Sequence, residues 1–142
     1  MGVTVAAVVR ARTAPASTES TSQCAPRPCI NADGYTMMVQ GVQRQTHLVR
    51  LEVSFQVRGQ TKMHAVPGDF SLLESGRTYR PYFDVGAGCP AWSRTQIPDG
   101  GHLGPKVLCF APPDPHGRLT LKWDPDLGIS EYFSSGYGLV LS

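Results

Sequence analysis

The sequence has little of what marks a helical or a nucleic-acid-binding protein. Its 142 residues carry three Lys against ten Arg, a single Asn and a formal net charge of only +2. The basic residues are scattered, whereas a nucleic-acid-binding protein usually gathers them on one face. Apolar residues rarely recur at the 3.6-residue spacing of an amphipathic helix. We therefore expect no nucleic-acid partner and no helical core. The excess of Arg, Ala, Gly and Pro indicates a high-GC, actinobacterium-like genome.

Motifs for catalysis or for a cofactor are also missing. The glycines near residues 86–101 form neither a dinucleotide-binding pattern nor a P-loop. There is no G-x-S-x-G elbow for a nucleophilic serine, and the four His residues show no metal-binding spacing. We expect no enzyme, no cofactor and no metal ion. A small hydrolase or metal-dependent enzyme that uses the loop at residues 84–105 with His102 is the enzymatic alternative.

The N-terminal residues contain no apolar run long enough to cross a bilayer. The run from Val3 to Val9 ends at Arg10, whereas a spanning helix needs about 20 residues. Two interpretations stay open: a disordered N-terminus or expression remnant, and the end of a signal or membrane-anchoring segment that starts upstream. Residues 13–22, T-A-P-A-S-T-E-S-T-S, have the composition of a flexible stalk. The sequence thus predicts a tail over residues 1–23 and a folded domain over 24–142.

The clearest structural signal lies at residues 47–58, H-L-V-R-L-E-V-S-F-Q-V-R, which follow Thr46. Apolar residues occupy the odd positions from Val49 to Val57, and polar or charged residues occupy the even ones. Side chains alternate across a strand, so this segment predicts a half-buried antiparallel strand. Its exposed face is a candidate contact surface, made of Arg50, Glu52, Ser54, Gln56 and Arg58.

Six further strands are predicted between dense turn signals, because fifteen Gly and twelve Pro interrupt the chain. They cover residues 34–42, 70–74, 78–83, 106–111, 118–123 and 137–141. We expect the first connection at 41–45, a two-residue hairpin at Ser75-Gly76 and a turn at 114–117. Short strands without helices predict an all-β fold, an immunoglobulin-like antiparallel β-sandwich of about seven to eight strands.

One long segment, residues 84–105, shows no periodicity, and loops of this length are often functional. It carries Trp92, Arg94 and His102. We favour the interpretation in which Trp92 packs onto the sandwich and a disulfide holds the loop. Because Tyr and Trp are common at interfaces, the alternative is a contact patch made of Trp92, Arg94, His102 and Tyr132.

The four cysteines allow three disulfide connectivities. If Phe110 points into the core, the neighbouring Cys109 points outward and can meet Cys89 in the overlying loop. Cys24 and Cys29 then close a small ring before the first strand. We predict the pairs 24–29 and 89–109, which indicate an oxidising compartment.

The ordered residues resemble a bacterial extracytoplasmic family of unknown function with a telokin-like immunoglobulin fold. Its members include lipoproteins and a secreted mycobacterial immunogenic antigen. The resemblance covers about residues 34–142 and rests on packing and turn signals at Phe70, Leu72, Gly76, Tyr79, Pro98, Gly100, Val107, Phe110 and Pro113 (or Pro112). The chain departs from the family in its cysteines and in the length of the 84–105 segment. The resemblance implies a secreted or membrane-anchored module and supplies no catalytic residues.

Together these features predict a non-enzymatic, exported module at the bacterial cell envelope. The expected partner is a protein or a small ligand whose identity the sequence does not specify. A structural subunit of a larger assembly, such as a phage or secretion particle, is the other interpretation outside enzymology.

Overall fold

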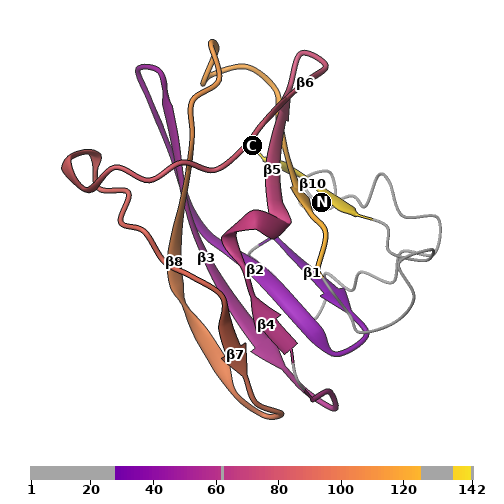
Figure 1. The fold of residues 1–142 in the computed structure, drawn as a ribbon. Coiled ribbons are helices and arrows are strands. Elements are labelled where there is room, and N and C mark those ends of the chain that lie inside the picture. Colours follow the sequence, from indigo (N-terminus) through magenta and orange to yellow (C-terminus); the bar gives the residue numbers. More distant parts are fainter. Residues whose placement is uncertain (1–27, 62, 126–135, 142) are drawn as a thin grey trace.

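The computed structural model describes residues 28–61, 63–125 and 136–141 (Figure 1). All regular structure in these ranges is antiparallel strand apart from short 3-10 turns, which confirms the all-β prediction. The strands are β1 (Cys29–Ala32), β2 (Tyr35–Gln45), β3 (Leu48–Val57), β4 (Met63–Ala65), β5 (Phe70–Glu74), β6 (Arg77–Tyr79), β7 (Thr95–Ile97), β8 (His102–Phe110), β9 (Leu119–Trp123) and β10 (Tyr137–Leu141). Among the described residues no helix has the length and apolar character needed to cross a bilayer.

Two four-stranded sheets form the layers of the molecule, in the orders β1-β2-β3-β8 and β10-β9-β5-β6. Their apolar faces meet in one core, where the Tyr35 ring lies 5.0 Å from Trp123 and the Phe55 ring 6.0 Å from Phe70. Each of these pairs joins one sheet to the other, so burial of aromatic surface holds the two layers together. The small β4-β7 sheet adds Met63, Ala65 and Ile97 to the same core.

The alternation predicted at residues 47–58 is present in β3. Leu51, Val53 and Phe55 are buried, whereas Ser54 is partly exposed and Gln56 is exposed. β3 lies between β2 and β8 and pairs with both. The strand is therefore central to its sheet, with one face on the core and the other toward solvent.

The connection expected at residues 41–45 is wrong. β2 continues through Gln45, and the turn falls at Thr46-His47, where His47 takes a φ of 59°. The reason is a β-bulge: Val39 pairs with Val53 and Gly41 with Glu52, so Gln40 is an extra residue in β2. The bulge shifts the alternation by one position. In the sequence this shift looks like the end of a strand.

The segment at 84–105 is more regular than predicted. It contains a 3-10 turn at Val85–Ala87, the strand β7 and the first residues of β8. β7 pairs with β4, residue Ile97 opposite Met63. Strands of three or four residues, such as β1, β4 and β7, are too short to show an alternation that a sequence reader can recognise.

Two predicted turns are confirmed. Glu74 pairs with Arg77 across Ser75 and Gly76, and both turn residues have positive φ, as the two-residue hairpin requires. In the second turn, the Gly117 amide donates to the Asp114 carbonyl at 3.2 Å.

Arg44 ties the end of β2 to distant parts of the chain. Its Nη1 donates to the carbonyls of Pro115 (3.0 Å) and Gly117 (2.8 Å), and its Nη2 to the carbonyl of Leu141 (3.3 Å). The planar guanidinium thus fastens the 114–117 turn and the C-terminal strand to the opposite sheet.

Candidate functional site

The solvent side of the β1-β2-β3-β8 sheet, here called the outer face, carries the features that go beyond packing. A loop covers it at one end, around Cys109 and Arg50. At the other end, around Ser54 and Gln56, the surface is hollowed. The two ends offer different chemistry.

A disulfide fastens the loop to the covered end. Leu108 and Phe110 belong to the main core, and Cys109 between them points to the outer face, where it bonds Cys89 with a Cα–Cα distance of 6.1 Å. Both cysteines are buried in a second, smaller apolar cluster with Leu48, against which Tyr82 and Val107 pack. The 89–109 pair predicted from side-chain direction is present. Cys24 lies outside the described residues, so the 24–29 pair stays a prediction.

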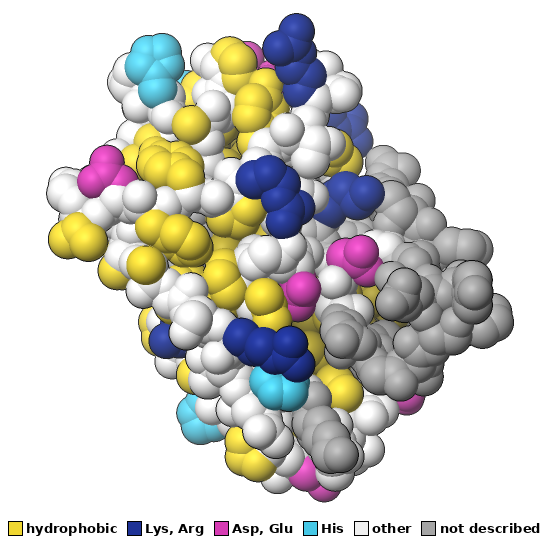
Figure 2. Space-filling model, in the orientation of Figure 1, with side chains coloured by type: hydrophobic (Ala, Val, Ile, Leu, Met, Phe, Trp, Pro, Cys, Tyr) yellow, Lys and Arg dark blue, Asp and Glu magenta, His cyan; other side chains and the backbone are white. Residues whose placement is uncertain are grey.

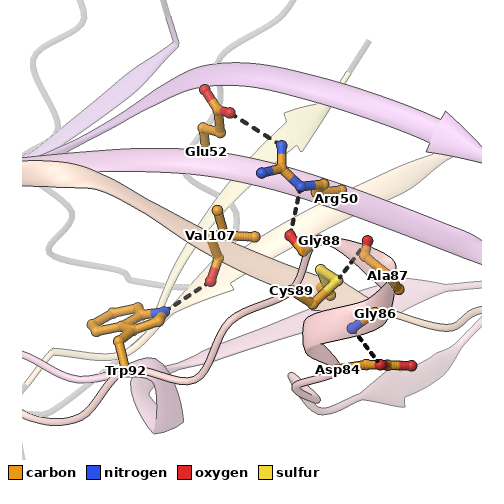
Figure 3. Close-up of a disulfide and its surroundings, with 10 residues drawn as sticks. Arg50, Glu52, Asp84, Gly86, Ala87, Gly88, Cys89, Trp92 and Val107 are labelled. Atoms are coloured by element: carbon orange, nitrogen blue, oxygen red, sulfur yellow. Dashed lines mark hydrogen bonds and ion pairs between the residues drawn. A yellow bond between two sulfur atoms is a disulfide. The ribbon is translucent and has the colours of Figure 1, made fainter.

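Arg50 of β3 also fastens this loop to the sheet. Its Nε donates to the Gly88 carbonyl at 2.9 Å, and its Nη1 lies 3.1 Å from a Glu52 carboxylate oxygen (Figure 3). Arg50 was expected on an open contact surface. It is instead engaged by the loop, so the open surface of the sheet begins beyond Glu52.

The loop is internally saturated with hydrogen bonds. Asp84 and Cys89 exchange two backbone bonds of 2.7 and 2.9 Å, and the Asp84 carboxylate accepts from the Gly86 amide at 3.0 Å. The amides of Ala87 and Gly88 donate to the carbonyls of Asp84 and Val85. The Asp84–Cys89 loop projects from the side of the molecule near β8 (Figure 1). It is a short rigid projection with few backbone donors left to offer.

Two apolar side chains are exposed where this loop begins. Val85 is 81% exposed and Phe83 is 41% exposed, and they are the two large hydrophobic residues exposed in the described part of the chain. Phe83 directly precedes the loop and Val85 lies within it, and we call these two residues together the loop tip. Single exposed apolar residues are common on surfaces. Here two of them lie within three residues of each other, next to a disulfide-fastened loop.

Trp92 follows the loop and packs as predicted. Its indole N–H donates to the Val107 carbonyl at 2.8 Å, its ring centroid lies 6.3 Å from that of Phe55, and the Lys106 ammonium lies 5.8 Å from the Trp92 ring centroid. Figure 3 shows the indole pointing at the β8 backbone. The Tyr82 amide also donates to the Cys109 carbonyl at 2.9 Å. Two carbonyls of β8, those of Val107 and Cys109, are therefore already occupied by residues outside the sheet.

The open end of the outer face holds a groove of about 320 Å³, here called the outer-face groove. It is lined by Thr36, Met38 and Gln40 of β2, by Ser54, Phe55 and Gln56 of β3, and by His102, Gly104 and Pro105 of β8. No Asp, Glu, Lys or Arg is among these residues. On its floor the Gln40 side-chain amide donates to the Ser54 hydroxyl at 2.7 Å.

Two β-bulges shape this groove. Gln40 is the extra residue where β2 pairs with β3. In the β3–β8 pairing the extra residue is in β8, because Gly104 and Pro105 face Ser54 alone between the Val53–Lys106 and Phe55–Leu103 pairs. Gly104 lies opposite, with a φ of 131°, and a Cβ there would come within 2.7 Å of the Ser54 Cα. Bulges re-aim side chains and are frequent beside binding sites. Here Gln40 of the first bulge donates to Ser54, the residue that lies opposite the second bulge.

The three described residues of the predicted contact patch, Trp92, Arg94 and His102, have different neighbours. Trp92 packs at β8, and the guanidinium of Arg94 lies 3.4 Å from the His64 ring nitrogen beside β4. His102 is exposed at the start of β8 and lines the outer-face groove. Tyr132 lies outside the described residues. A shared contact role for the four stays a prediction.

A second hollow, of about 230 Å³, lies beside the opposite sheet. It is lined by Gly68, Asp69, Ser71, Arg80, Lys122, Asp124 and Gly136. Its side chains include two cations and two carboxylates, and Arg80 donates to the Gly68 carbonyl at 2.6 Å. Because the two cations and the two carboxylates balance, this hollow favours neither an anionic nor a cationic ligand.

The described residues contain no cluster of potential metal ligands, and the basic side chains on one face are spread out. No three His, Cys, Asp or Glu side chains gather there as metal ligands. The face in Figure 2 shows dark blue basic side chains separated by apolar and uncharged ones. This distribution differs from the continuous basic stripe of nucleic-acid-binding surfaces.

Sequence reasoning did not identify the loop tip or the outer-face groove. Phe83 was assigned to a strand, and Val85 has no special sequence context. The groove depends on pairing registers, which one sequence does not display. The one available signal was Gly41 and Gly104 near or inside apolar strands, since such glycines often mark bulges or close backbone approach.

Three solved structures with a similar fold come from Bacillus subtilis and Listeria monocytogenes. The Bacillus subtilis protein yjhA has a TM-score of 0.65 at 17% identity, over 80% of this chain and 96% of its own. The candidate lipoprotein ycdA of Bacillus subtilis gives 0.63 at 12% identity, over 79% of this chain and 38% of its own. A functionally unknown protein of Listeria monocytogenes gives 0.57 at 10% identity, over 96% and 90%. No protein-family profile and no curated protein matches the sequence.

These likenesses show a shared all-β fold and nothing about activity, because identities of 10 to 17% are too low to carry function. The resemblance to lipoproteins expected from the sequence is met in part, since ycdA is one candidate of that class. This chain corresponds to little more than a third of ycdA.

Proposed function

We propose that this chain is an exported, non-enzymatic immunoglobulin-like module of the telokin-like type, which makes protein contacts at the bacterial cell envelope. The observation that carries the proposal is the loop tip. Phe83 and Val85 are exposed on a loop that a disulfide and the Arg50–Gly88 hydrogen bond hold in place. A rigid apolar projection loses little conformational entropy on binding and suits a hollow on another protein.

Two further observations support the compartment. The Cys89–Cys109 disulfide is buried in its own apolar cluster, and disulfides of this structural kind belong to oxidising compartments. The fold likeness to ycdA, a candidate lipoprotein, points the same way.

The contact role is tested by photo-crosslinking in intact cells of the native bacterium. A photoreactive residue replaces Val85 in the full chain, and in a matched control it replaces Gln43, which is exposed on β2. We expect a discrete crosslinked envelope protein at position 85 and not at position 43. A Phe83→Asp exchange in the same chain should reduce its yield about tenfold or more, because a charge enters an apolar contact.

Contacts between copies of this chain are the alternative, as in a structural subunit. Crosslinks at position 85 to a second copy, together with concentration-dependent size-exclusion elution, would replace the envelope partner with self-assembly. Equal yields at positions 85 and 43 would overturn the contact role. Recovery of the protein in the cytoplasm with reduced thiols would overturn export.

A further inference from the structure

The outer-face groove has the chemistry of a site for an uncharged ligand. Its hydrogen-bonding groups are hydroxyls, side-chain amides and one imidazole, from Thr36, Ser54, Gln40, Gln56 and His102. None of the lining residues is Asp, Glu, Lys or Arg. A charged ligand would lose its hydration there without gaining an opposite charge, which is unfavourable. Charge complementarity therefore selects a neutral occupant.

The groove also offers apolar surface beside its polar groups. Met38 and Pro105 line it together with the backbone of Gly104. A ligand that fits both kinds of surface has an apolar face and a rim of hydroxyl groups. We propose that the outer-face groove binds an uncharged carbohydrate, with one sugar face on Met38 and Pro105 and its hydroxyls on the amides. This site is independent of the loop tip and of the proposed function.

An extended peptide fits the geometry less well. Peptides add to sheets through main-chain hydrogen bonds along an edge strand. At the β8 edge, the Val107 carbonyl accepts from Trp92, the Cys109 carbonyl accepts from Tyr82, and Pro105 has no amide proton. The groove lies on the face of the sheet, where side chains supply the hydrogen bonds. A dense set of neutral side-chain donors and acceptors matches the hydroxyls of a sugar.

Some polar groups of the groove are held in place by other residues, and others are exposed and can bond to a ligand. Gln40 is held by its bonds to the Ser54 hydroxyl at 2.7 Å and to the Met38 sulfur at 3.8 Å, which leaves its amide oxygen to accept from a ligand. Gln56 is exposed and His102 lies opposite it in the strand pairing, so both side chains can reach a ligand at the rim. The volume of about 320 Å³ is at the lower end for small-molecule sites and suits a short glycan segment.

The test uses nitrogen-15 NMR of the full chain, because Gln40 and Gln56 report directly through their side-chain NH₂ signals. The probes are maltotriose, cellotriose, mannotriose and the trimer of N-acetylglucosamine, with trialanine as a neutral peptide and triglutamate and trilysine as charged controls. We expect at least one neutral sugar to shift both amide signals in a saturable way. Gln56→Ala should weaken that sugar about fivefold, the loss of one hydrogen bond, and Gln43→Ala should leave it unchanged.

Each other outcome overturns the proposal. No saturable shift with any of the four sugars would do so, as would a sugar affinity that Gln56→Ala leaves intact. Shifts caused by trialanine and not by sugars would make the groove a peptide site. Shifts caused by triglutamate or trilysine alone would show that charge governs binding. None of these results bears on photo-crosslinking at position 85, so the two proposals fail separately.

Discussion

At the scale of single residues, Tyr35 shows how burial changes acid–base behaviour. Its side chain is fully buried between Phe55 and Trp123, and its hydroxyl donates to the His64 carbonyl at 2.7 Å. Burial disfavours the charged phenolate, and the negative charge of Asp69 adds to this, so the pKa of Tyr35 is raised well above its ordinary value. The folded protein therefore keeps this proton at a pH where the unfolded chain releases it.

The sign of the pH dependence follows. The pKa of Tyr35 is higher in the folded protein than in the unfolded chain, where it is about 10. The contribution of Tyr35 to stability is therefore fully present below about pH 10 and is lost as the pH rises above that value. Tyr35→Phe removes the titration and the hydrogen bond. We expect a loss of about 1 kcal/mol at pH 7 and a shallower fall in stability above about pH 10. Urea unfolding over a pH series measures both, and equal slopes in the two proteins would contradict the assignment.

At the scale of elements, the bulged strands β2 and β8 shape the outer-face groove, and Gly104 is the residue on which the β8 bulge depends. Gly104 combines a φ of 131° with a backbone approach that leaves a Cβ 2.7 Å from the Ser54 Cα. Few L side chains adopt that conformation, and the clash is with backbone, which cannot move aside easily. Gly41, beside the other bulge, has open space around it.

These two glycines form a matched pair for mutagenesis. Gly104→Ala should lower the free energy of unfolding by about 2 kcal/mol or more, because strain and steric overlap add. Gly41→Ala should change it by less than about 1 kcal/mol, with stabilisation the expected sign since Gly weakens a strand. Denaturant unfolding of both variants checks this. Similar losses in the two would show that the β8 bulge is adjustable.

At the scale of the whole molecule, the two sheets share one core while the disulfide belongs to a separate cluster. Trp123 contacts Tyr35, Phe70 and Tyr137 at the centre of that core, and Cys89 and Cys109 lie outside it with Leu48. The layers should therefore unfold together. The disulfide should add to stability without being needed for the fold.

Replacing both cysteines tests this arrangement. The double variant Cys89→Ala with Cys109→Ala should lose about 3 kcal/mol, the chain-entropy value for a loop of this size, and should still unfold in one cooperative transition. The separation of the two cysteines is 20 residues. In a Trp92→Phe background, Trp123 fluorescence and far-ultraviolet circular dichroism should give coincident curves. Separate midpoints would show that the sheets are independent units.

Much of the architecture was predictable because it rests on local patterns. Alternation in β3, the Ser75-Gly76 hairpin and the 114–117 turn each follow from residue types a few positions apart. The outward direction of Cys109 follows from the same two-residue period. Short strands such as β7 were missed, because three residues are too few to show a recognisable alternation of apolar and polar side chains.

The candidate sites were less accessible to sequence reasoning. Trp92 packs against the sandwich, as the sequence predicted. His102 was predicted as a contact residue, but the groove that it lines was not. The groove brings Gln40, Ser54 and Gly104 together from three strands, and its shape depends on where two pairings slip by a residue. A slip of this kind is decided by the fit of whole strands across the sheet, and glycines such as Gly41 and Gly104 hint at it without fixing the register.

Sequence alone therefore indicated the all-β class and the two faces of β3, because strand alternation and turn signals are local patterns. It also predicted Cys109 as the partner of Cys89, because Cys109 points outward from its strand. Tertiary structure alone determined what lies on the outer face. It placed a disulfide-held loop with Phe83 and Val85 over one end and left a neutral groove at the other. The physical reason is that surfaces are assembled from residues distant in the chain, and their chemistry exists only after the strands have paired.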